Sequence, residues 1–205
     1  MARRTKEDAM ATRDGILDAA EQLFLEQGVS RTTLQHIASA AGVTRGAIYW
    51  HFADKAALFN AMMERAKMPL EAAMELIGQS EQADVVQALR ESVLCVWRVT
   101  MTDIKVRRVF EIATFKMELV ADMEAVRLRR LEGKAKWMAR AENRIKAGIR
   151  HGQLREGLPV RAVALGLFAL LDGMMRSWLL DPEAFHLLKT GQQIVDMHLE
   201  SLRAT

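Results

Sequence analysis

Polar and aromatic side chains gather between residues 44 and 51, where the sequence reads TRGAIYWH. If this segment is a short helix, Val43, Ile48 and Phe52 face its neighbours. The remaining side chains then point outward: Thr44, Arg45, Tyr49, Trp50 and His51. Such a group is costly to expose on a purely structural helix, but its donors and apolar surfaces suit base edges in the DNA major groove. The open alternative is a corner of a helical bundle that binds nothing.

The side chains of this region divide into candidates for base contacts and for phosphate contacts. Base contacts give sequence specificity, whereas phosphate contacts position the protein. Arg45 is the candidate for a base edge, with guanine as its expected partner. The phosphate candidates are the donors Tyr49 and His51 and, at expected helix N-termini where an anion is favoured, Thr32, Thr33 and Lys55. Arg3, Arg4 and Lys6 form a basic arm that can follow a groove.

Two short helices joined by a glycine turn are predicted to position these side chains. Thr32, as N-cap, and Gln35 have the spacing of a capping box that starts the first helix. Gly42 permits the positive φ of a tight turn, and Thr44 caps the second helix, which runs to about His51. A helix pair of this kind is a helix-turn-helix.

Longer helices are expected on both sides of the pair. The apolar stripe of the first one consists of Ile16, Ala19, Ala20, Leu23 and Phe24, at helical spacing. This helix should stop at Gly28, a left-handed C-cap. Asp54 should cap the helix that follows the pair, and Pro69 should kink or break it. We therefore place a three-helix DNA-binding domain at residues 9–69.

The rest of the chain is predicted to be helical as well. Half of the residues are hydrophobic, good helix formers dominate and β-branched runs are absent, which favours an all-α fold with a substantial core. Expected helices cover Ala83–Met101, Lys105–Leu119, Met123–Arg150 and Pro159 to about Leu180, and the last one starts at Asp181-Pro182-Glu183. Residues 70–205 thus form a larger helical domain.

The helix-turn-helix also matches a family pattern. From Thr33 to Lys55 the sequence reads T-x-x-x-I-A-x-x-A-G-V-x-x-G-x-x-Y-x-H-F-x-x-K, which resembles the signature of TetR-family repressors at every fixed position. Gly46 is one of them and completes the expected DNA-binding set. The string AGVTRGAIYWHFADKAALF further resembles the subgroup that regulates multidrug efflux pumps. The resemblance covers roughly residues 10–65; beyond them only length and helix order agree. It implies a homodimer that binds a double-stranded DNA operator and a small inducer.

The helix from Pro159 to Leu180 is apolar nearly all round, so it must be covered on two sides. Its apolar residues are Val163, Leu167, Leu170, Leu171, Met174, Met175, Trp178 and Leu179. Those of the last helix are Leu187, Leu188, Ile194, Val195, Leu199 and Leu202. Within the family resemblance, the last two helices of each subunit would form a four-helix bundle, with Trp178 on the interface side. Alternatively, both helices only complete the core of one chain.

A carboxylate interrupts the apolar stripe of the same helix. Asp172 shares this stripe with Leu165, Phe168, Met175 and Arg176, and a carboxylate in apolar surroundings is costly unless it is paired. It either forms an ion pair with Arg176 or anchors a polar group of a mostly apolar ligand.

Further walls of a ligand site are expected upstream, where Phe110 and Thr114 share one helix face and Trp97 can join them. The predicted ligand-binding set is Trp97, Phe110, Thr114, Phe168, Asp172, Met175 and Arg176. Apolar and aromatic walls with few polar groups suit a lipophilic or aromatic compound. The alternative is that the Met and Phe residues are ordinary core.

Catalytic, cofactor and metal sites are not predicted. The five histidines lack metal-ligand spacing with carboxylates or with Cys95, and no phosphate loop or nucleophile motif occurs. A single cysteine, no apolar leader and no apolar run of membrane length predict a soluble, cytoplasmic protein. Residues 1–55 hold seven basic and seven acidic side chains, so the DNA-binding prediction rests on placement and not on bulk charge.

Two other functions remain open. One is a DNA-binding regulator without a small-molecule switch, whose C-terminal half binds a protein partner. The other is a small-molecule carrier or enzyme with a vestigial helix-turn-helix. The intact set of Arg45, Tyr49, His51 and Lys55 argues against the second alternative.

Overall fold

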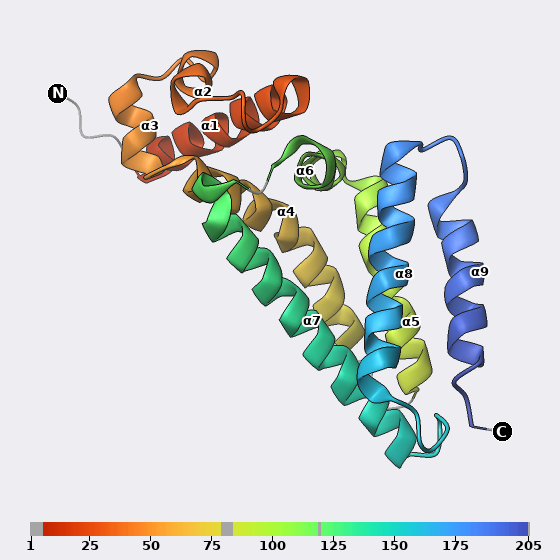
Figure 1. Cartoon of the computed structure of the whole chain (residues 1–205). Helices are drawn as coiled ribbons and strands as arrows, with labels where there is room; N and C mark the ends of the chain where they lie inside the picture. The colour runs from red at the N-terminus through yellow and green to blue at the C-terminus, as the bar shows by residue number, and fades with distance from the viewer. Residues whose placement is uncertain (1–5, 79–83, 119, 205) are drawn as a thin grey trace. The chain divides into compact units, whose positions relative to one another are not determined.

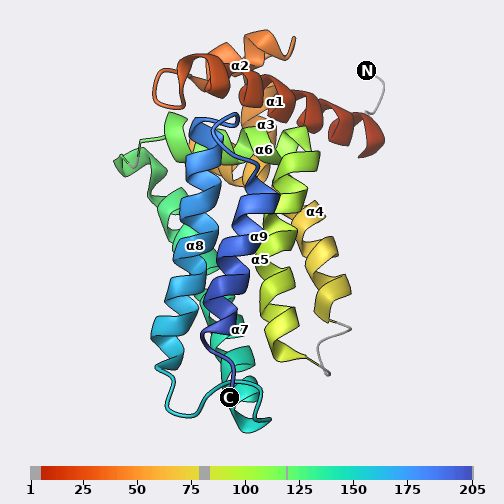
Figure 2. The ribbon, with the colours of Figure 1, turned by 90° about the vertical axis from the view of Figure 1, so that its right-hand side faces the viewer.

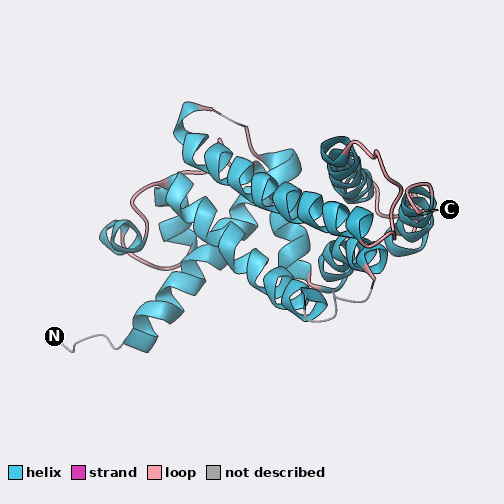
Figure 3. Cartoon of the chain, turned by 90° about the horizontal axis from the view of Figure 1, so that it is seen from below, coloured by secondary structure: helices cyan, strands magenta, loops and turns pink. Residues whose placement is uncertain are grey.

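The structure is a computed structural model that describes residues 6–78, 84–118 and 120–204. Every regular element in these ranges is helical, and Figure 3 shows helices joined by loops. The predicted all-α fold is therefore confirmed. Arg3 and Arg4 of the basic arm, and the predicted helix start at Ala83, lie outside the described residues.

The chain forms two compact units. The first consists of residues 1–67 and 105–130, and the second of residues 68–104 and 131–205. The first unit contains α1 (Lys6–Gln27), α2 (Leu34–Ala40), α3 (Arg45–His51), the start of α4 (Lys55–Gly78), most of α6 (Ile104–Glu111), a π-helical turn (Ile112–Lys116) and the start of α7 (Glu124–Arg150). The second contains α5 (Val85–Thr102), α8 (Val160–Leu180), α9 (Leu187–Glu200) and the remainder of α4 and α7. Figure 1 labels these helices. The functional division between residues 69 and 70 stays a prediction.

The buried face of the first helix agrees with the predicted apolar stripe at three of its five positions. Ile16, Ala20 and Phe24 are buried as expected, and Gly28 follows the helix with φ +84°. Ala19 and Leu23 are only half-buried. The buried face of α1 also includes a carboxylate, because Glu21 is 4% exposed.

The negative charge of the buried Glu21 is compensated by two arginines from other helices. Arg65 of α4 and Arg108 of α6 each place a guanidinium nitrogen 3.5 Å from one of its carboxylate oxygens. Burial nevertheless raises the pKa of Glu21 above its ordinary value, against the opposing effect of Arg108 and Arg65. This cluster ties α1 to α4 and α6, and helical periodicity gave no sign of it.

The fourth helix confirms the prediction for Asp54, and of the kink or break predicted at Pro69 it excludes the break. The carboxylate of Asp54 accepts a hydrogen bond from the backbone N–H of Ala57 at 2.6 Å, as expected for a cap. The helix is not broken at Pro69, since α4 continues through it to Gly78. Proline removes one backbone donor, but Met62 and Ala66 are buried just before it, and such burial offsets the loss of a single helical hydrogen bond.

In the second unit α5, α8 and α9 lie side by side, as Figure 2 shows. Trp97 of α5 lies between them and is fully buried, and its indole N–H donates to the carbonyl oxygen of Leu171 at 3.1 Å. The ring lies against the backbone of α9, where a Cβ atom at Gly191 would come within 2.5 Å of it. Glycine at this position therefore permits the close approach of α9 to Trp97.

The helix boundaries predicted after residue 104 need two corrections. The α8 helix ends at Leu180 as predicted. The Asp181-Pro182-Glu183 start signal was wrong, because Asp181 accepts from Glu183 N within a turn and α9 begins at Leu187, after the cap His186. The segment from Lys105 to Leu119 is not one helix either, since α6 ends at Glu111 and the π-helical turn follows.

The α8 helix is long and apolar enough to cross a membrane when only length and composition are considered, and no other helix in the described ranges is. Part of its surface packs against α5 and α9.

Candidate nucleic-acid interface

The start of α2 lies one residue later than the capping box predicted. Thr33, not Thr32, is the N-cap, and its hydroxyl oxygen accepts from the backbone N–H of His36 at 3.2 Å. Thr32 is fully buried and donates its hydroxyl to the carbonyl oxygen of Gly28 at 2.8 Å. The turn after α1 thus uses the Thr32 hydroxyl for its own closure. The Thr32 side chain is not open to a phosphate, whereas Thr33 is exposed.

The turn between α2 and α3 has the predicted geometry. Gly42 has φ +65°, and the N–H of Val43 donates to the carbonyl oxygen of Ala38 at 2.9 Å. Thr44 caps α3 by accepting from the N–H of Ala47 at 3.2 Å. With Ala38 and Ile48 fully buried between the helices, the pair is a helix-turn-helix whose outer face is held rigidly.

The outer face of α3 carries the predicted donors and rings. Arg45 and Gly46 are exposed, and Tyr49 and Trp50 are 47% and 74% exposed. The guanidinium of Arg45 lies 5.7 Å from the centre of the Tyr49 ring, which favours an extended arginine over the helix surface. The ring of the half-buried His51 lies 4.6 Å from that of Trp50 and nearly perpendicular to it. An indole this exposed contributes nothing to the core and is available to a partner.

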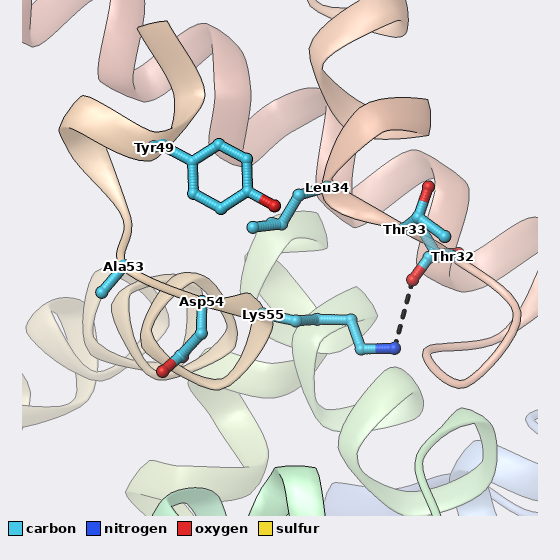
Figure 4. Close-up of a pocket in the computed structure, with 7 residues that line it drawn as sticks. All are labelled: Thr32, Thr33, Leu34, Tyr49, Ala53, Asp54 and Lys55. Atoms are coloured by element: carbon cyan, nitrogen blue, oxygen red, sulfur yellow. Dashed lines mark hydrogen bonds between the residues drawn. The ribbon is translucent and has the colours of Figure 1, made fainter. Parts of the chain in front are cut away.

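A hollow beside this face is lined by Thr32, Thr33, Leu34, Tyr49, Ala53, Asp54 and Lys55. Figure 4 shows the Tyr49 ring extending from α3 toward Leu34, with the Lys55 side chain running along the other side of the hollow. The ammonium of Lys55 donates to the carbonyl oxygens of Val29 at 2.9 Å and Thr32 at 3.2 Å. Two of its three N–H donors therefore have intramolecular partners that the sequence did not reveal.

The predicted ligand-binding residues fall in both units. Phe110 and Thr114, both half-buried, belong to the first unit. The other five belong to the second unit: Trp97, Phe168, Asp172, Met175 and Arg176. Trp97 and Met175 are buried, and Trp97 serves the helix packing described above.

The expected apolar surroundings of Asp172 are not observed. Its side chain is 45% exposed and lies 3.8 Å from Arg176. Phe168 is held by neighbours that the sequence did not indicate: the Trp137 ring lies 5.4 Å from its ring, and the Lys134 ammonium lies 5.0 Å from its centre. No periodicity in α7 pointed to these two contacts.

Comparison with known proteins gives consistent matches over nearly the whole chain. Residues 16–62 match the family model of bacterial regulatory proteins of the tetR family, and residues 84–204 match that of the C-terminal region of MAATS-type transcriptional repressors. The chain is 37% identical over 203 residues to the HTH-type transcriptional regulator TtgR of Pseudomonas putida, covering 99% of this chain and 97% of that protein.

Two solved structures extend the comparison. NalD, the secondary repressor of the MexAB-OprM multidrug efflux pump in Pseudomonas aeruginosa, superimposes with a TM-score of 0.87 at 33% identity, over 97% of this chain and 98% of that chain. The complex of SmeT with triclosan gives a TM-score of 0.80 at 34% identity, over 94% and 92% of the two chains. SmeT is the repressor of the Stenotrophomonas maltophilia multidrug efflux pump SmeDEF.

Proposed function

The chain belongs to the TetR family of bacterial regulatory proteins, and we propose that it represses a multidrug efflux pump until a lipophilic compound releases it from DNA. Like its relatives, it is a DNA-binding transcriptional repressor and not an enzyme. The observation that carries the proposal is the exposed face of α3, on which Arg45, Tyr49 and Trp50 are held by a capped helix and available to DNA. Such a protein works in the cytoplasm, where its operator lies.

We propose that different residues of α3 contact the bases and the phosphates of the operator. Arg45, in the first turn, enters the major groove and donates to guanine, while the Tyr49 hydroxyl and the His51 imidazole reach phosphates. The exposed Trp50 offers an apolar surface that suits a thymine methyl group. Thr33, Thr44 and Gly46 lie beside this path and allow the DNA backbone to approach.

Dimerisation is proposed to occur through α8 and α9. The outward side of α8 presents small and apolar residues at helical spacing, all exposed in the single chain: Ala162, Leu165, Ala169, Gly173 and Leu180. Small residues let two helices approach closely, and Met197 of α9 is 67% exposed. A two-fold axis through this surface would form a four-helix bundle and present two copies of α3 to a pseudo-palindromic operator.

A small-molecule inducer is supported by one relative, and we propose that its site lies in the C-terminal half. SmeT, which is similar to this chain over 94% of this chain and 92% of its own, forms a complex with triclosan, a small aromatic compound of the expected type. The ligand would bind more tightly to the form of the repressor that does not bind DNA. It would therefore shift the equilibrium toward that form. The alternative remains a regulator whose C-terminal half binds a protein partner.

One experiment separates these two functions. The genomic sites bound by the protein identify a duplex, and the complex with this duplex is then titrated with triclosan and other lipophilic compounds. Release of the protein from DNA, together with a thermal shift by the same compounds, supports the proposal. A site far from any transporter gene, with no release by any compound, would support the alternative.

Replacing Arg45 with alanine should lower operator affinity by about 1–3 kcal/mol and relax specificity at one base pair of each half-site. The reason is the loss of a directed contact from the first turn of α3. Binding to a set of single-base operator variants measures this effect. Arg161→Ala, an exposed arginine at the start of α8, is the control. Equal loss on every operator variant would identify Arg45 as a phosphate contact.

Replacing Asp172 with asparagine should reduce inducer affinity by about ten- to a hundredfold. The Asp172–Arg176 pair is nearly half exposed, so its loss should change the free energy of unfolding by less than about 1 kcal/mol. Titration of the operator complex with a compound that releases the wild-type protein, beside a thermal melt, measures both effects. Glu183→Gln, also exposed, is the control. Identical induction curves would leave Asp172 with a structural role only.

A further inference from the structure

A histidine near the end of α9 lies in the contact between α9 and α8. One edge of the His198 ring lies against α8 at Gly166, where a Cβ atom would stand 3.7 Å from both Cε1 and Nε2 of the ring. The Nε2 atom is buried, and no group of the described residues forms a hydrogen bond with it. The polar ring of His198 is thus packed into a helix contact that does not use this polar atom.

The protonation state of His198 decides whether this packing is favourable. A neutral imidazole has one N–H donor and one acceptor nitrogen, whereas an imidazolium has two donors and a positive charge. A buried donor without an acceptor is unfavourable, and a charged donor is more so. The favoured neutral tautomer therefore carries its proton on Nδ1 and leaves the Nε2 lone pair in the contact. Protonation places an N–H at Nε2, where it meets no acceptor.

The carboxylates of α9 that are nearest to His198 in the sequence already have partners. Arg90 of α5 donates to Asp196 at 2.6 Å, and Arg203 donates to Glu200 at 2.8 Å. The residues one helical turn from His198 carry no charge: Ile194, Val195, Ser201 and Leu202. The helix that carries the imidazole therefore does not compensate its positive charge.

The elements packed beside α9 do not compensate this charge either. Helix α8 has no carboxylate before Asp172, and its one charged residue up to that point is the cation Arg161. On α5, the carboxylate of Glu91 already pairs with two arginines. The loop beside the end of α9 carries one charge of each sign, Arg155 and Glu156, and both residues are exposed.

Burial in these surroundings lowers the pKa of His198 below its ordinary value. The folded chain therefore binds this proton less readily than a chain in which α8 and α9 are apart. Such a group stabilises the contact fully above the ordinary histidine pKa of about 6.5, and the stabilisation is lost as the pH falls through that value.

The His198 ring borders the surface through which we propose dimerisation. On α8, Leu165 and Ala169 lie one and three residues from Gly166 and are exposed. On α9, Met197 precedes His198 and is 67% exposed. A second copy of the chain seated on these residues would remove more water from the imidazole, so association and the loss of the proton favour each other.

We propose that His198 makes the α8–α9 contact, and with it the repressor dimer, sensitive to acid: protonation loosens α9 from α8, separates the subunits and releases the operator. This inference rests on the dimer proposed above and adds a regulatory input to it. Gly166 and His198 do not belong to the predicted ligand-binding set, so the proton acts independently of a lipophilic inducer.

The test measures the dimer dissociation constant by sedimentation, without DNA, between about pH 8 and about pH 5.5. For the wild type we expect dissociation to be about tenfold or more stronger at the acid end, with a slope of log dissociation constant against pH no steeper than about two, because each subunit binds one proton. His198→Gln keeps a polar side chain that is neutral at every pH, and it should lose this dependence. The same dependence in His198→Gln as in the wild type would overturn the proposal.

His186 provides the matched control on the same helix. It caps α9 by accepting from the N–H of Lys189 at 3.3 Å through Nδ1, and a protonated ring cannot accept this bond. His186→Asn keeps a cap at every pH and should retain the acid sensitivity of the wild type. Sensitivity that disappears in His186→Asn and persists in His198→Gln would assign the effect to the cap and contradict the role of His198.

A titration of the wild-type protein covers the case in which His198→Gln does not fold. The NMR signal of the His198 Cε1–H should titrate at a lower pH than that of His151, which is exposed. A midpoint equal to or above that of His151 would overturn the proposal. A wild type that is monomeric at about pH 8 would contradict the dimer itself and this inference with it. A dimer that is equally tight at both ends of the pH range contradicts the role of His198 alone.

Discussion

Replacing Leu165 with glutamate should convert the dimer to monomers and weaken operator binding by about a hundredfold or more, because one half-site alone offers too few contacts. Leu165 is 48% exposed and lies on the outward apolar side of α8. In a two-fold interface the new carboxylate would be desolvated, and it would face its own copy if it lies near the axis. Sedimentation velocity reports the oligomeric state, and a gel shift with the duplex from the genomic sites reports binding.

The exposure of Leu165 makes it a better test than Trp178, which the sequence placed on the interface side. Trp178 is 5% exposed within its own chain, so a charge there would disrupt the fold before it tested the dimer. Leu128 of α7 has the same 48% exposure as Leu165, and Leu128→Glu is the matched control, expected to remain dimeric and to bind DNA. A Leu165→Glu protein that sediments as a dimer would rule out α8 as the interface.

Replacing Trp97 with alanine should lower the free energy of unfolding by about 3–5 kcal/mol. The ring is fully buried between α5, α8 and α9, and its N–H bond to Leu171 is lost with it. Urea unfolding at a fixed protein concentration measures the change, since the stability of a dimer depends on concentration.

A double-mutant cycle with Gly191 identifies the contact responsible. Gly191→Ala alone should cost about 1–3 kcal/mol, because the new Cβ would meet the Trp97 ring. In the Trp97→Ala background that clash is absent, so the second substitution should cost little and the two effects should not add. Additive effects would show that α9 does not rest on the Trp97 ring, and would return Trp97 to the list of candidate inducer contacts.

The effects expected for Leu165→Glu and Trp97→Ala both depend on how α8 and α9 pack in the folded chain. The sequence predicted that α8 is apolar nearly all round, and Val163, Leu167 and Trp178 are indeed buried. It did not predict which apolar residues face the same chain and which face outward, because periodicity defines stripes on a helix but not the position of its neighbours. The same limit explains why Asp172 was expected in apolar surroundings and is half exposed.

The sequence by itself determined the all-α fold, the helix-turn-helix and the exposed donors of α3. These depend on contacts three or four residues apart, such as the caps formed by Thr44 and Asp54, and on backbone angles that favour glycine at Gly28 and Gly42. Short-range hydrogen bonds and dihedral preferences are properties of a local segment, so the order of residues is sufficient to predict them.

Only the tertiary structure decided which partners the charged and polar groups take. Lys55 bonds carbonyl oxygens 23 and 26 residues away, and Arg108 approaches Glu21 across 87 residues. Of the adjacent threonines, Thr33 caps α2 and Thr32 is buried, because the carbonyl oxygen of Gly28 lies within reach of Thr32. A buried polar group takes whichever partner the packing brings within about 3 Å, and the packing is set by the whole chain.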